Sequence, residues 1–417
     1  MLEWPPYRRE CAGGHVVLQL LTISSGVVPQ TQQPSSHGSR PRILSISFSP
    51  LTRDARVLRQ IAVLAEFGDV TTVGFGPAPA SASTHIEVPA DLASLPQTVT
   101  GVARLAIRAH RSAEMAAPAL AYARAALAHE RFDLVVANDA RALPLAFEAA
   151  HGAPVWADLH EWAPEEQSHI LSWRLLVAPF MTALCRTYLP QCAAVTTVSP
   201  LIADLYAERF GVDAGVVRNA RPFEDLVPSP LVEGRVRLVH SGVAVPERCI
   251  ETLIDATLAL DERFTLDLFL VFGDDDRYRR ELVQRAQGSE RITFHDPVAP
   301  HDLPAALNAY DLGVYLLKPT TTNHRFMLPN KFFDFVQSRI GVVFGHAVEI
   351  DHLIAEHGLG LTVSGFESDD LVAALSSLTA EQVAGFKSNS DIAARALSSE
   401  VDAETQREVL RRLLSRT

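Results

Sequence analysis

The residues best suited to chemistry lie at 328–334, where the sequence LPNKFFD follows an apolar segment at 311–317. This arrangement predicts a buried strand followed by the start of a helix that carries Lys331 and Asp334. A helix start has unpaired N–H groups and about half a positive charge, so it attracts phosphate. Lys331 can reach a phosphate, and Asp334 can accept hydrogen bonds from ribose hydroxyls. The segment therefore predicts a nucleotide diphosphate site, although the same two residues could simply face water on an ordinary helix.

Length and composition indicate a soluble globular protein. The 417 residues suffice for two or three domains, and a hydrophobic content of 47% can form sizeable cores. A formal net charge of −12 argues against a nucleic-acid partner, because nucleic-acid-binding proteins usually present a basic face to the phosphates. The cysteines lack the spacing of a disulfide framework or a zinc site, so we expect no metal and a cytoplasmic location. They are Cys11, Cys185, Cys192 and Cys249.

We expect residues 1–41 to form a disordered extension, because the run at 31–41 is polar and rich in Pro and Ser. The apolar patch at 16–23 imitates a signal peptide, but no small-residue cleavage site follows it cleanly. A mistaken start codon would also explain this extension. No transmembrane span is predicted, because charged residues and prolines interrupt the most apolar region, 170–194.

From residue 42 onward, strand-like segments alternate with amphipathic helical segments, which is typical of a parallel sheet covered on both faces. The sequence therefore predicts an α/β protein with two tandem Rossmann-like, doubly wound domains facing each other across a cleft. We place these domains at 42–218 and 235–397, with a Pro-rich linker at 219–234 and a final helix within 398–417 that could pack across either domain. Strands are expected at 43–48, 70–74, 134–137, 155–158, 195–198 and 215–217, and then at 237–240, 266–272, 291–295, 311–317 and 341–344.

Ligands of open parallel sheets bind outside the carboxyl ends of the strands, so functional residues are expected in the loops that follow strands. Both predicted domains carry polar residues in such loops. In the first domain they are Asp54, Arg56, Asp139, Asp158, His160 and Glu161, and in the second they are Gly242, Arg248, Gly273, Asn330, Lys331 and Asp334.

The order and content of these segments resemble the GT-B glycosyltransferases, specifically the retaining family 4 enzymes that use nucleotide-diphosphate sugars. The resemblance extends from about residue 42 to the C-terminus, and its motifs are fairly specific only in combination. They are DARV at 54–57, DLHE at 158–161, TVSP at 197–200, VRN at 217–219, HSG at 240–242 followed by Arg248, GD at 273–274, and LPNKFFD at 328–334.

The resemblance implies that the second domain holds the nucleotide sugar, with Arg248 and Lys331 near the diphosphate and Asp334 at the ribose. Gly242, Gly273 and Asn330 belong to the same implied donor site. Cations held near the leaving diphosphate stabilise the charge that develops as the glycosidic bond breaks, so Arg248 and Lys331 count as catalytic candidates. Such enzymes need neither a bound metal nor a cofactor. Arg248 could otherwise be a surface residue at the start of a helix.

On the first domain, His160 lies where related enzymes place a histidine near the transferred sugar, and it is the third catalytic candidate. Asp158 or Glu161 could orient its imidazole. The remaining acceptor-side candidates are Asp139, which could bind acceptor hydroxyls, together with Asp54 and Arg56 on the same rim. A structural histidine and a helix-capping Asp54 are the corresponding alternatives.

Two departures from the family pattern weaken the case for catalysis. The E-x7-E motif of the family would place its first Glu at Phe326, and its second is shortened to Asp334. The first Glu normally contacts the donor sugar, so the identity of that sugar stays open. Val243 also replaces an arginine that often follows the glycine corresponding to Gly242.

The segment 101–131 is rich in arginine, and Arg104, Arg108 and Arg111 align on one helical face. Such a face could contact anionic lipid headgroups, and family relatives often modify lipid-linked acceptors at a membrane. We therefore expect a glycan or lipid-linked acceptor and consider peripheral contact with the inner face of the membrane. The alternative is a solvated helix whose arginine stems cover apolar surface.

Taken together, these features predict a cytoplasmic, metal-independent retaining glycosyltransferase that acts on a hydroxyl acceptor, in surface polysaccharide or glycoconjugate assembly. Two alternatives stay open. One is a non-catalytic subunit that binds a nucleotide or a partner protein, which the missing Glu at position 326 favours. The other is a sugar-nucleotide 2-epimerase, which has the same architecture but needs additional acid/base carboxylates.

Overall fold

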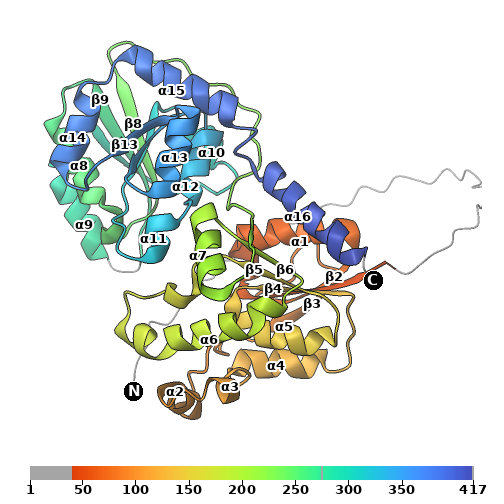
Figure 1. The fold of residues 1–417 in the computed structure, drawn as a ribbon. Helices are drawn as coiled ribbons and strands as arrows, with labels where there is room; N and C mark the ends of the chain where they lie inside the picture. Colours follow the sequence, from red (N-terminus) through yellow and green to blue (C-terminus); the bar gives the residue numbers. More distant parts are fainter. Residues whose placement is uncertain (1–39, 274–275, 416–417) are drawn as a thin grey trace, which may run out of the picture. The chain divides into compact units, whose positions relative to one another are not determined.

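The computed structural model describes residues 40–273 and 276–415. Most of the extension expected at 1–41 lies outside these residues. The described chain forms two parallel sheets, one with strand order β3-β2-β1-β4-β5-β6-β7 and one with order β10-β9-β8-β11-β12-β13 (Figure 1). Every strand pair in both sheets is parallel. The predicted α/β fold class with two Rossmann-like sheets is confirmed.

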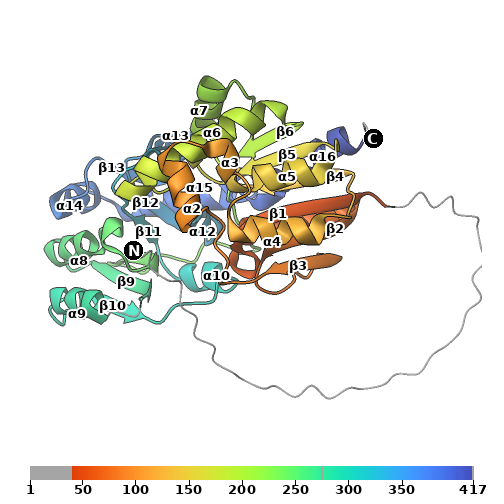
Figure 2. The same cartoon turned by 90° about the horizontal axis from the view of Figure 1, so that it is seen from below.

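The first sheet is built from short apolar strands whose central members are buried along their whole length, as expected for a sheet covered on both faces. Figure 1 shows α1 and α16 on one face of this sheet and α4 and α5 on the other, and Figure 2 shows α4 and α5 from below. Its strands are β1 (Arg42–Pro50), β2 (Asp69–Phe75), β3 (Thr84–Val88), β4 (Leu134–Asn138), β5 (Val155–Leu159), β6 (Ala194–Thr197) and β7 (Gly215–Val216). Its helices are α1 (Ala55–Phe67), α2 (Val99–Ala106), α3 (His110–Ala113), α4 (Pro118–Leu127), α5 (Leu143–Ala150), α6 (Ala178–Tyr188) and α7 (Pro200–Phe210).

The second sheet has the same layered construction. Its strands are β8 (Val236–Val243), β9 (Phe264–Val271), β10 (Ile292–His295), β11 (Leu312–Tyr315), β12 (Gly341–Gly345) and β13 (Gly360–Val363). Its helices are α8 (Ile250–Ala259), α9 (Asp276–Arg285), α10 (Leu303–Leu307), α11 (Thr322–Phe326), α12 (Asn330–Gln337), α13 (Val348–His357), α14 (Ser368–Ser376) and α15 (Ala380–Ala393).

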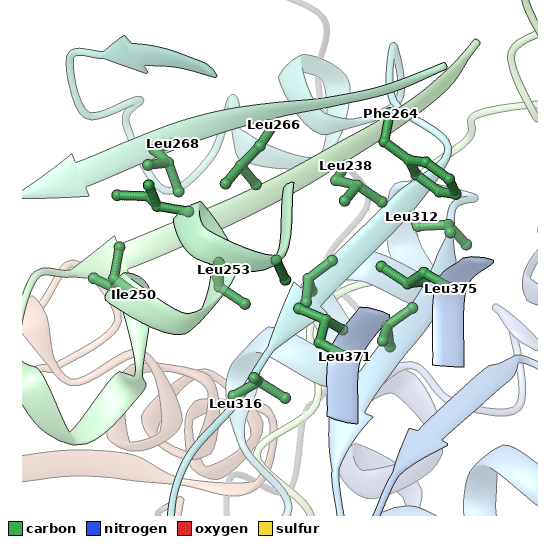
Figure 3. Close-up of a cluster of buried hydrophobic side chains, with 14 of the residues drawn as sticks. Leu238, Ile250, Leu253, Phe264, Leu266, Leu268, Leu312, Leu316, Leu371 and Leu375 are labelled. Atoms are coloured by element: carbon green, nitrogen blue, oxygen red, sulfur yellow. The ribbon is translucent and has the colours of Figure 1, made fainter. Parts of the chain in front are cut away.

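Two apolar clusters hold the second sheet between its helices. On one face, leucines of β8, β9 and β11 pack against α8 and α14, as Figure 3 shows for Leu238, Leu253 and Leu371. On the other face, Phe332 and Phe335 of α12 pack against strand residues and α13. Because α12 is anchored by buried phenylalanines, its first turn is held at a fixed place beside the sheet.

The C-terminal helix α16 (Ser399–Leu414) packs on α1 of the first sheet. Leu410 and Leu413 are buried in the same cluster as Ile61 of α1. On the exposed side, Arg407 Nε lies 2.8 Å from Glu66 Oε2. The helix expected near the C-terminus therefore covers the first sheet, although it follows the second one in sequence.

Candidate functional site

A pocket of about 440 Å³ opens beside the carboxyl ends of β8, β9 and β11. In the described chain its lining carries five cationic side chains and a single carboxylate, that of Asp334. Burial, followed by the neighbouring Arg56, lowers the pKa of Arg59 to about 10. The pocket is therefore suited to an anionic ligand. Its cations are Arg53, Arg59, Arg221, Arg248 and Lys331.

Gly242, near the end of β8, lets two of these cations meet. Its φ of +141° is a conformation that other residues rarely adopt. A Cβ at this position would lie 2.4 Å from Arg248 Nη1 and 3.3 Å from Lys331 Cε. The two side chains therefore lie directly over the backbone of Gly242. Arg248 Nη1 is held there by a 3.2 Å hydrogen bond to the carbonyl oxygen of Val243.

Asp334 is clamped between two cations. Lys331 Nζ donates to Asp334 Oδ2 at 2.8 Å, and Arg221 Nη1 donates to Asp334 Oδ1 at 2.9 Å. Asp334 is only 4% exposed. Each carboxylate oxygen keeps one further lone pair for a ribose hydroxyl, so the ribose role stays a prediction.

The sequence analysis missed Arg221, although it lies two residues beyond the VRN motif at 217–219 in the predicted linker. Its Nε is buried, lies 3.8 Å from Glu224 Oε1 and makes no hydrogen bond within the described part of the chain. A buried donor of this kind is costly unless a ligand or water meets it. Together with its bond to Asp334, this makes Arg221 a candidate donor-site residue.

Helix α12 adds backbone donors to the pocket. It begins at Asn330 after Pro329, and no side chain caps its start. Asn330, Lys331 and Asp334 all line the pocket, whereas Gly273 does not. The structure thus brings together five of the six predicted donor residues, leaving Gly273 aside. The lining also contains apolar residues, which are Phe269, Val271, Pro297, Val298, Pro300 and Leu303.

His160 lies at the end of β5 in the first sheet, among residues that follow β4. Its Nε2 is 3.2 Å from Asn138 Oδ1 and 3.6 Å from Asp158 Oδ2, and its Nδ1 is 3.6 Å from Asp139 Oδ2. Burial opposes the charge of the imidazolium, but Asp139 and then Asp158 outweigh it and raise the pKa of His160 to about 9. At neutral pH, His160 is therefore a cationic hydrogen-bond donor and not a general base.

Arg56 and Asp158 lie beneath this site and not on its rim. Asp158 is fully buried and Arg56 is 3% exposed, with Arg56 Nη2 2.7 Å from Asp158 Oδ1. Gln60 and Thr196 also donate to the carboxylate of Asp158. Burial alone would raise the pKa of Asp158, but Arg56 holds it below its ordinary value. The position of Asp158 fits the expectation that it orients His160, whereas Arg56 is buried and does not lie on the rim where we expected it.

Asp54 and Glu161, which we expected on the acceptor side, both have partners within the protein, and their role toward an acceptor stays a prediction. Asp54 caps α1, since its Oδ1 accepts a 3.1 Å hydrogen bond from the backbone N–H of Val57. This supports the capping alternative. Glu161 is exposed and accepts a 3.2 Å hydrogen bond from Asn323 Nδ2 on α11. Of the expected acceptor-side residues, Asp139 stays next to His160, because its Oδ1 accepts from the backbone N–H of His160 at 3.1 Å.

Helix α11, which ends at the position of the missing family glutamate, is attached to the loops of the first sheet. The backbone N–H of Trp162 donates to Asn323 Oδ1 at 2.7 Å, and Ser199 Oγ donates to the carbonyl oxygen of Phe326 at 2.7 Å. Asn323 is 7% exposed. No sequence motif indicated this role of Asn323, because the contact joins residues 161 positions apart.

The described residues contain no group of three or more His, Cys, Asp or Glu side chains that could hold a metal ion. The prediction of a metal-independent reaction is not tested by this observation.

Comparison with known proteins supports the assignment of the fold. A family model described as Glycosyltransferase Family 4 matches residues 57–220. A search of curated protein sequences gives no match.

The solved structures similar to this chain include several glycosyltransferases. HepE of Anabaena, in complex with UDP-glucose, is 18% identical with a TM-score of 0.61, and the match covers 89% of this chain and 99% of HepE. Sucrose-phosphate synthase of Thermosynechococcus elongatus is 15% identical with a TM-score of 0.65, covering 91% and 100%. The lipopolysaccharide outer core galactosyltransferase WaaB is 12% identical with a TM-score of 0.57, covering 88% and 99%.

These matches and the two parallel sheets confirm the resemblance drawn from the motifs. The chain has the two-domain GT-B glycosyltransferase fold, and its first domain carries the sequence pattern of Glycosyltransferase Family 4.

Proposed function

We propose that this protein is a retaining glycosyltransferase that moves a sugar from a nucleotide-diphosphate sugar to a hydroxyl acceptor. The observation that carries the proposal is the convergence of Arg248 and Lys331 over the bare backbone of Gly242. Two cations above a glycine, beside the uncapped start of α12, form a cradle for a diphosphate.

The charges of the pocket suit the reaction. When the bond between the sugar and the diphosphate breaks, negative charge develops on the leaving phosphate oxygen. Arg248 and Lys331 stabilise the transition state, in which this charge develops, more strongly than they stabilise the bound substrate. The difference lowers the reaction barrier. The apolar lining residues, including Phe269 and Leu303, offer the base a surface to pack against.

Retention of the anomeric configuration follows, in this proposal, from attack of the acceptor hydroxyl on the face from which the diphosphate departs. The proton of the hydroxyl then passes to the leaving phosphate oxygen. His160 donates a hydrogen bond to the sugar or acceptor and takes no proton, because its pKa is raised to about 9. Asp139 holds the loop of His160 and is the residue of this site best placed to meet an acceptor hydroxyl.

The proposal also extends to the donor sugar, the acceptor and the location of the enzyme. HepE binds UDP-glucose in its solved complex, so UDP-sugars are the donors to test first. We propose a glycan or lipid-linked acceptor, in surface polysaccharide or glycoconjugate assembly at the cytoplasmic side of a membrane. In the described chain, no helix is long and apolar enough to cross a bilayer.

One observation favours a second candidate function, a subunit that binds nucleotide without transferring sugar. Both oxygens of Asp334 are already engaged by cations, and Phe326 occupies the position of the family glutamate. Such a subunit would bind a nucleoside diphosphate but would not turn over its sugar.

Thermal unfolding tests the proposal, since a ligand stabilises only a protein that binds it. The panel of ligands contains UDP, GDP and ADP and the sugars linked to each of these nucleotides. We expect one nucleotide sugar to raise the Tm of the wild type and of Lys318→Ala but not of Lys331→Ala. Lys318 is the matched control because it pairs with Glu367 outside the pocket.

The nucleotide sugar that stabilises the protein is then incubated with candidate acceptors, and the anomeric configuration of the product is read by NMR. A product with the configuration of the donor supports retention. Inversion would overturn the retaining mechanism. Binding without turnover against any acceptor, including water, would favour the non-catalytic subunit, and no binding at all would overturn both.

A further inference from the structure

Helix α2 exposes apolar residues that no other part of the described chain covers. Val99 is 89% exposed and Ile107, at the end of the helix, is 76% exposed. The two residues are eight positions apart and therefore lie on one side of the helix. The other side is anchored, because Gly101 and Leu105 are buried. The helix is thus fixed in place with an apolar side facing outward.

A second segment, between β5 and α6, has the same character. It contains a π-helical turn, Trp173–Val177, whose Trp173 and Val177 are 1% and 4% exposed and hold the turn against the protein. Leu171 and Leu175 point the other way and are 61% and 56% exposed. They are four residues apart and form a second outward-facing apolar pair.

The two segments meet although they are far apart in sequence. Arg108 Nη1 donates a 2.8 Å hydrogen bond to the carbonyl oxygen of Leu175, and α2 contacts the π-helical turn. Arg108 adopts a φ of 60°, which turns the chain sharply at the end of α2. We call the combined surface the α2–π surface, and its exposed apolar residues are Val99, Ile107, Leu171 and Leu175.

The charge of this surface is opposite to that of the whole protein. The chain has a formal net charge of −12, yet residues 92–113 and 167–203 contain no Asp or Glu. Arg108, Arg111 and Arg174 are exposed here, and the described chain offers none of them an ion pair with a carboxylate. Arg104, which the sequence aligned with them, instead donates to the carbonyl oxygen of Ser112 at 3.0 Å.

Exposed leucine, isoleucine and valine side chains among unpaired arginines match a lipid surface with anionic headgroups. The apolar side chains enter the boundary between headgroups and acyl chains, while the guanidinium groups remain at the phosphates. An acidic protein surface could also pair with these arginines, but a bilayer offers in addition an apolar layer for side chains that project from two separate segments. The occupant that fits this chemistry is therefore an anionic membrane.

We propose that the α2–π surface docks the protein on an anionic membrane and orients its first sheet toward a lipid-linked acceptor. The π-helical turn follows the loop of His160 and Glu161, and α6 contacts the turn Ala140–Ala142, which follows Asp139. The docking surface thus adjoins the carboxyl end of the first sheet, where the acceptor is expected. The orientation toward an acceptor rests on the proposed glycosyl transfer, whereas the docking does not.

Co-sedimentation of the full chain with vesicles tests the docking. Vesicles of phosphatidylcholine alone are compared with vesicles that also contain phosphatidylglycerol. We expect binding to the anionic vesicles and about tenfold weaker partition for the double variant Ile107→Ser/Leu175→Ser, since two inserted side chains are lost. Ile392→Ser is the matched control, because Ile392 is 78% exposed on α15, away from this surface.

The double variant Arg111→Gln/Arg174→Gln should lose the preference for anionic vesicles while keeping weak binding. Tm values equal to that of the wild type show that each variant is folded. The docking is overturned if the wild type stays in the supernatant, or if Ile107→Ser/Leu175→Ser binds as well as Ile392→Ser. The second result would place the contact elsewhere in the chain.

Nucleotide binding is measured on the same variants to separate the two proposals. We expect the thermal shift with the nucleotide sugar to be unchanged in all of them, because no substituted residue lines the donor pocket. Vesicle binding without any nucleotide shift in the wild type would leave the docking surface standing and overturn glycosyl transfer. A Tm shift with the nucleotide sugar but no vesicle binding would overturn the docking and leave glycosyl transfer standing.

Discussion

The donor pocket and the His160 site differ in their balance of positive and negative side chains. The pocket collects five cations around one carboxylate, and among the described residues Arg53, Arg59 and Arg248 form no ion pair with a carboxylate, whereas Arg221 and Lys331 share Asp334. At His160, by contrast, Asp139 and Asp158 flank one imidazole, and Arg56 neutralises Asp158 from below. The pocket is therefore incomplete without an anion, whereas the His160 site is already balanced.

This difference indicates what each region contributes. Unpaired cations bind and stabilise a diphosphate, so substitutions in the pocket should weaken ligand binding with little loss of stability. A buried and balanced network holds a loop in place, so substitutions at its base should first reduce stability. The following predictions test this division.

The largest effect is expected from separating the buried pair beneath His160. Arg56→Met leaves the carboxylate of Asp158 buried without its main partner, which should lower the free energy of unfolding by about 3–5 kcal/mol. Urea denaturation measures this value. The double variant Arg56→Met/Asp158→Leu should recover part of the loss, because it buries no unpaired charge. A loss below about 1 kcal/mol for Arg56→Met would contradict the structural role of the pair.

Gly242→Ala should weaken the donor site and lower stability modestly, because alanine rarely adopts a φ of +141°. The new Cβ would lie 2.4 Å from Arg248 Nη1, and the flexible guanidinium would have to leave the cradle. We expect binding of the nucleotide sugar, measured by calorimetry, to weaken about 100-fold, which is close to 2.7 kcal/mol. Gly273→Ala is the control, since nothing lies within 4 Å of its added Cβ. Equal losses in the two variants would mean that the cradle does not depend on Gly242.

The pH dependence of stability should report the charge on His160. The folded-state pKa of about 9 exceeds the unfolded value of 6.5, so protonation stabilises the fold fully below pH 6.5. That stabilisation, about 3 kcal/mol for the difference between 9 and 6.5, is lost as the pH rises through 9. The Tm difference between wild type and His160→Gln should therefore shrink from pH 6.5 to pH 10. A difference that is constant with pH would show that His160 is neutral in the fold.

Arg221→Ala should produce the smallest of these effects. It frees one oxygen of Asp334 and leaves Lys331 as the remaining cation on that carboxylate, which draws Lys331 away from a diphosphate. We expect about tenfold weaker binding of the nucleoside diphosphate, or roughly 1.4 kcal/mol, with a nearly unchanged Tm. Arg235→Ala serves as the control at an exposed position. Tighter binding in Arg221→Ala would instead indicate that Arg221 competes with the ribose for Asp334.

Much of the fold could be predicted because local pattern determines secondary structure. Apolar runs and helical periodicity located most strands of both sheets, and they predicted a helix start within 328–334, where α12 begins at Asn330. The sequence missed β3 and β13, which are short strands at sheet edges. Edge strands are partly exposed, so they lack the continuous apolar run that marks a central strand.

Within the site, the sequence determined the contacts between residues that are close together in the chain. The three-residue spacing of Lys331 and Asp334 puts both on one face of α12, and Arg248 follows Gly242 closely enough to fold back over it. Only the tertiary structure decided which charges are buried. It placed Arg56 and Asp158 in contact across 102 positions, added Arg221 to Asp334, and joined α2 to the turn at Leu175. Burial and charge pairing depend on neighbours that are remote in sequence, and no local pattern encodes them.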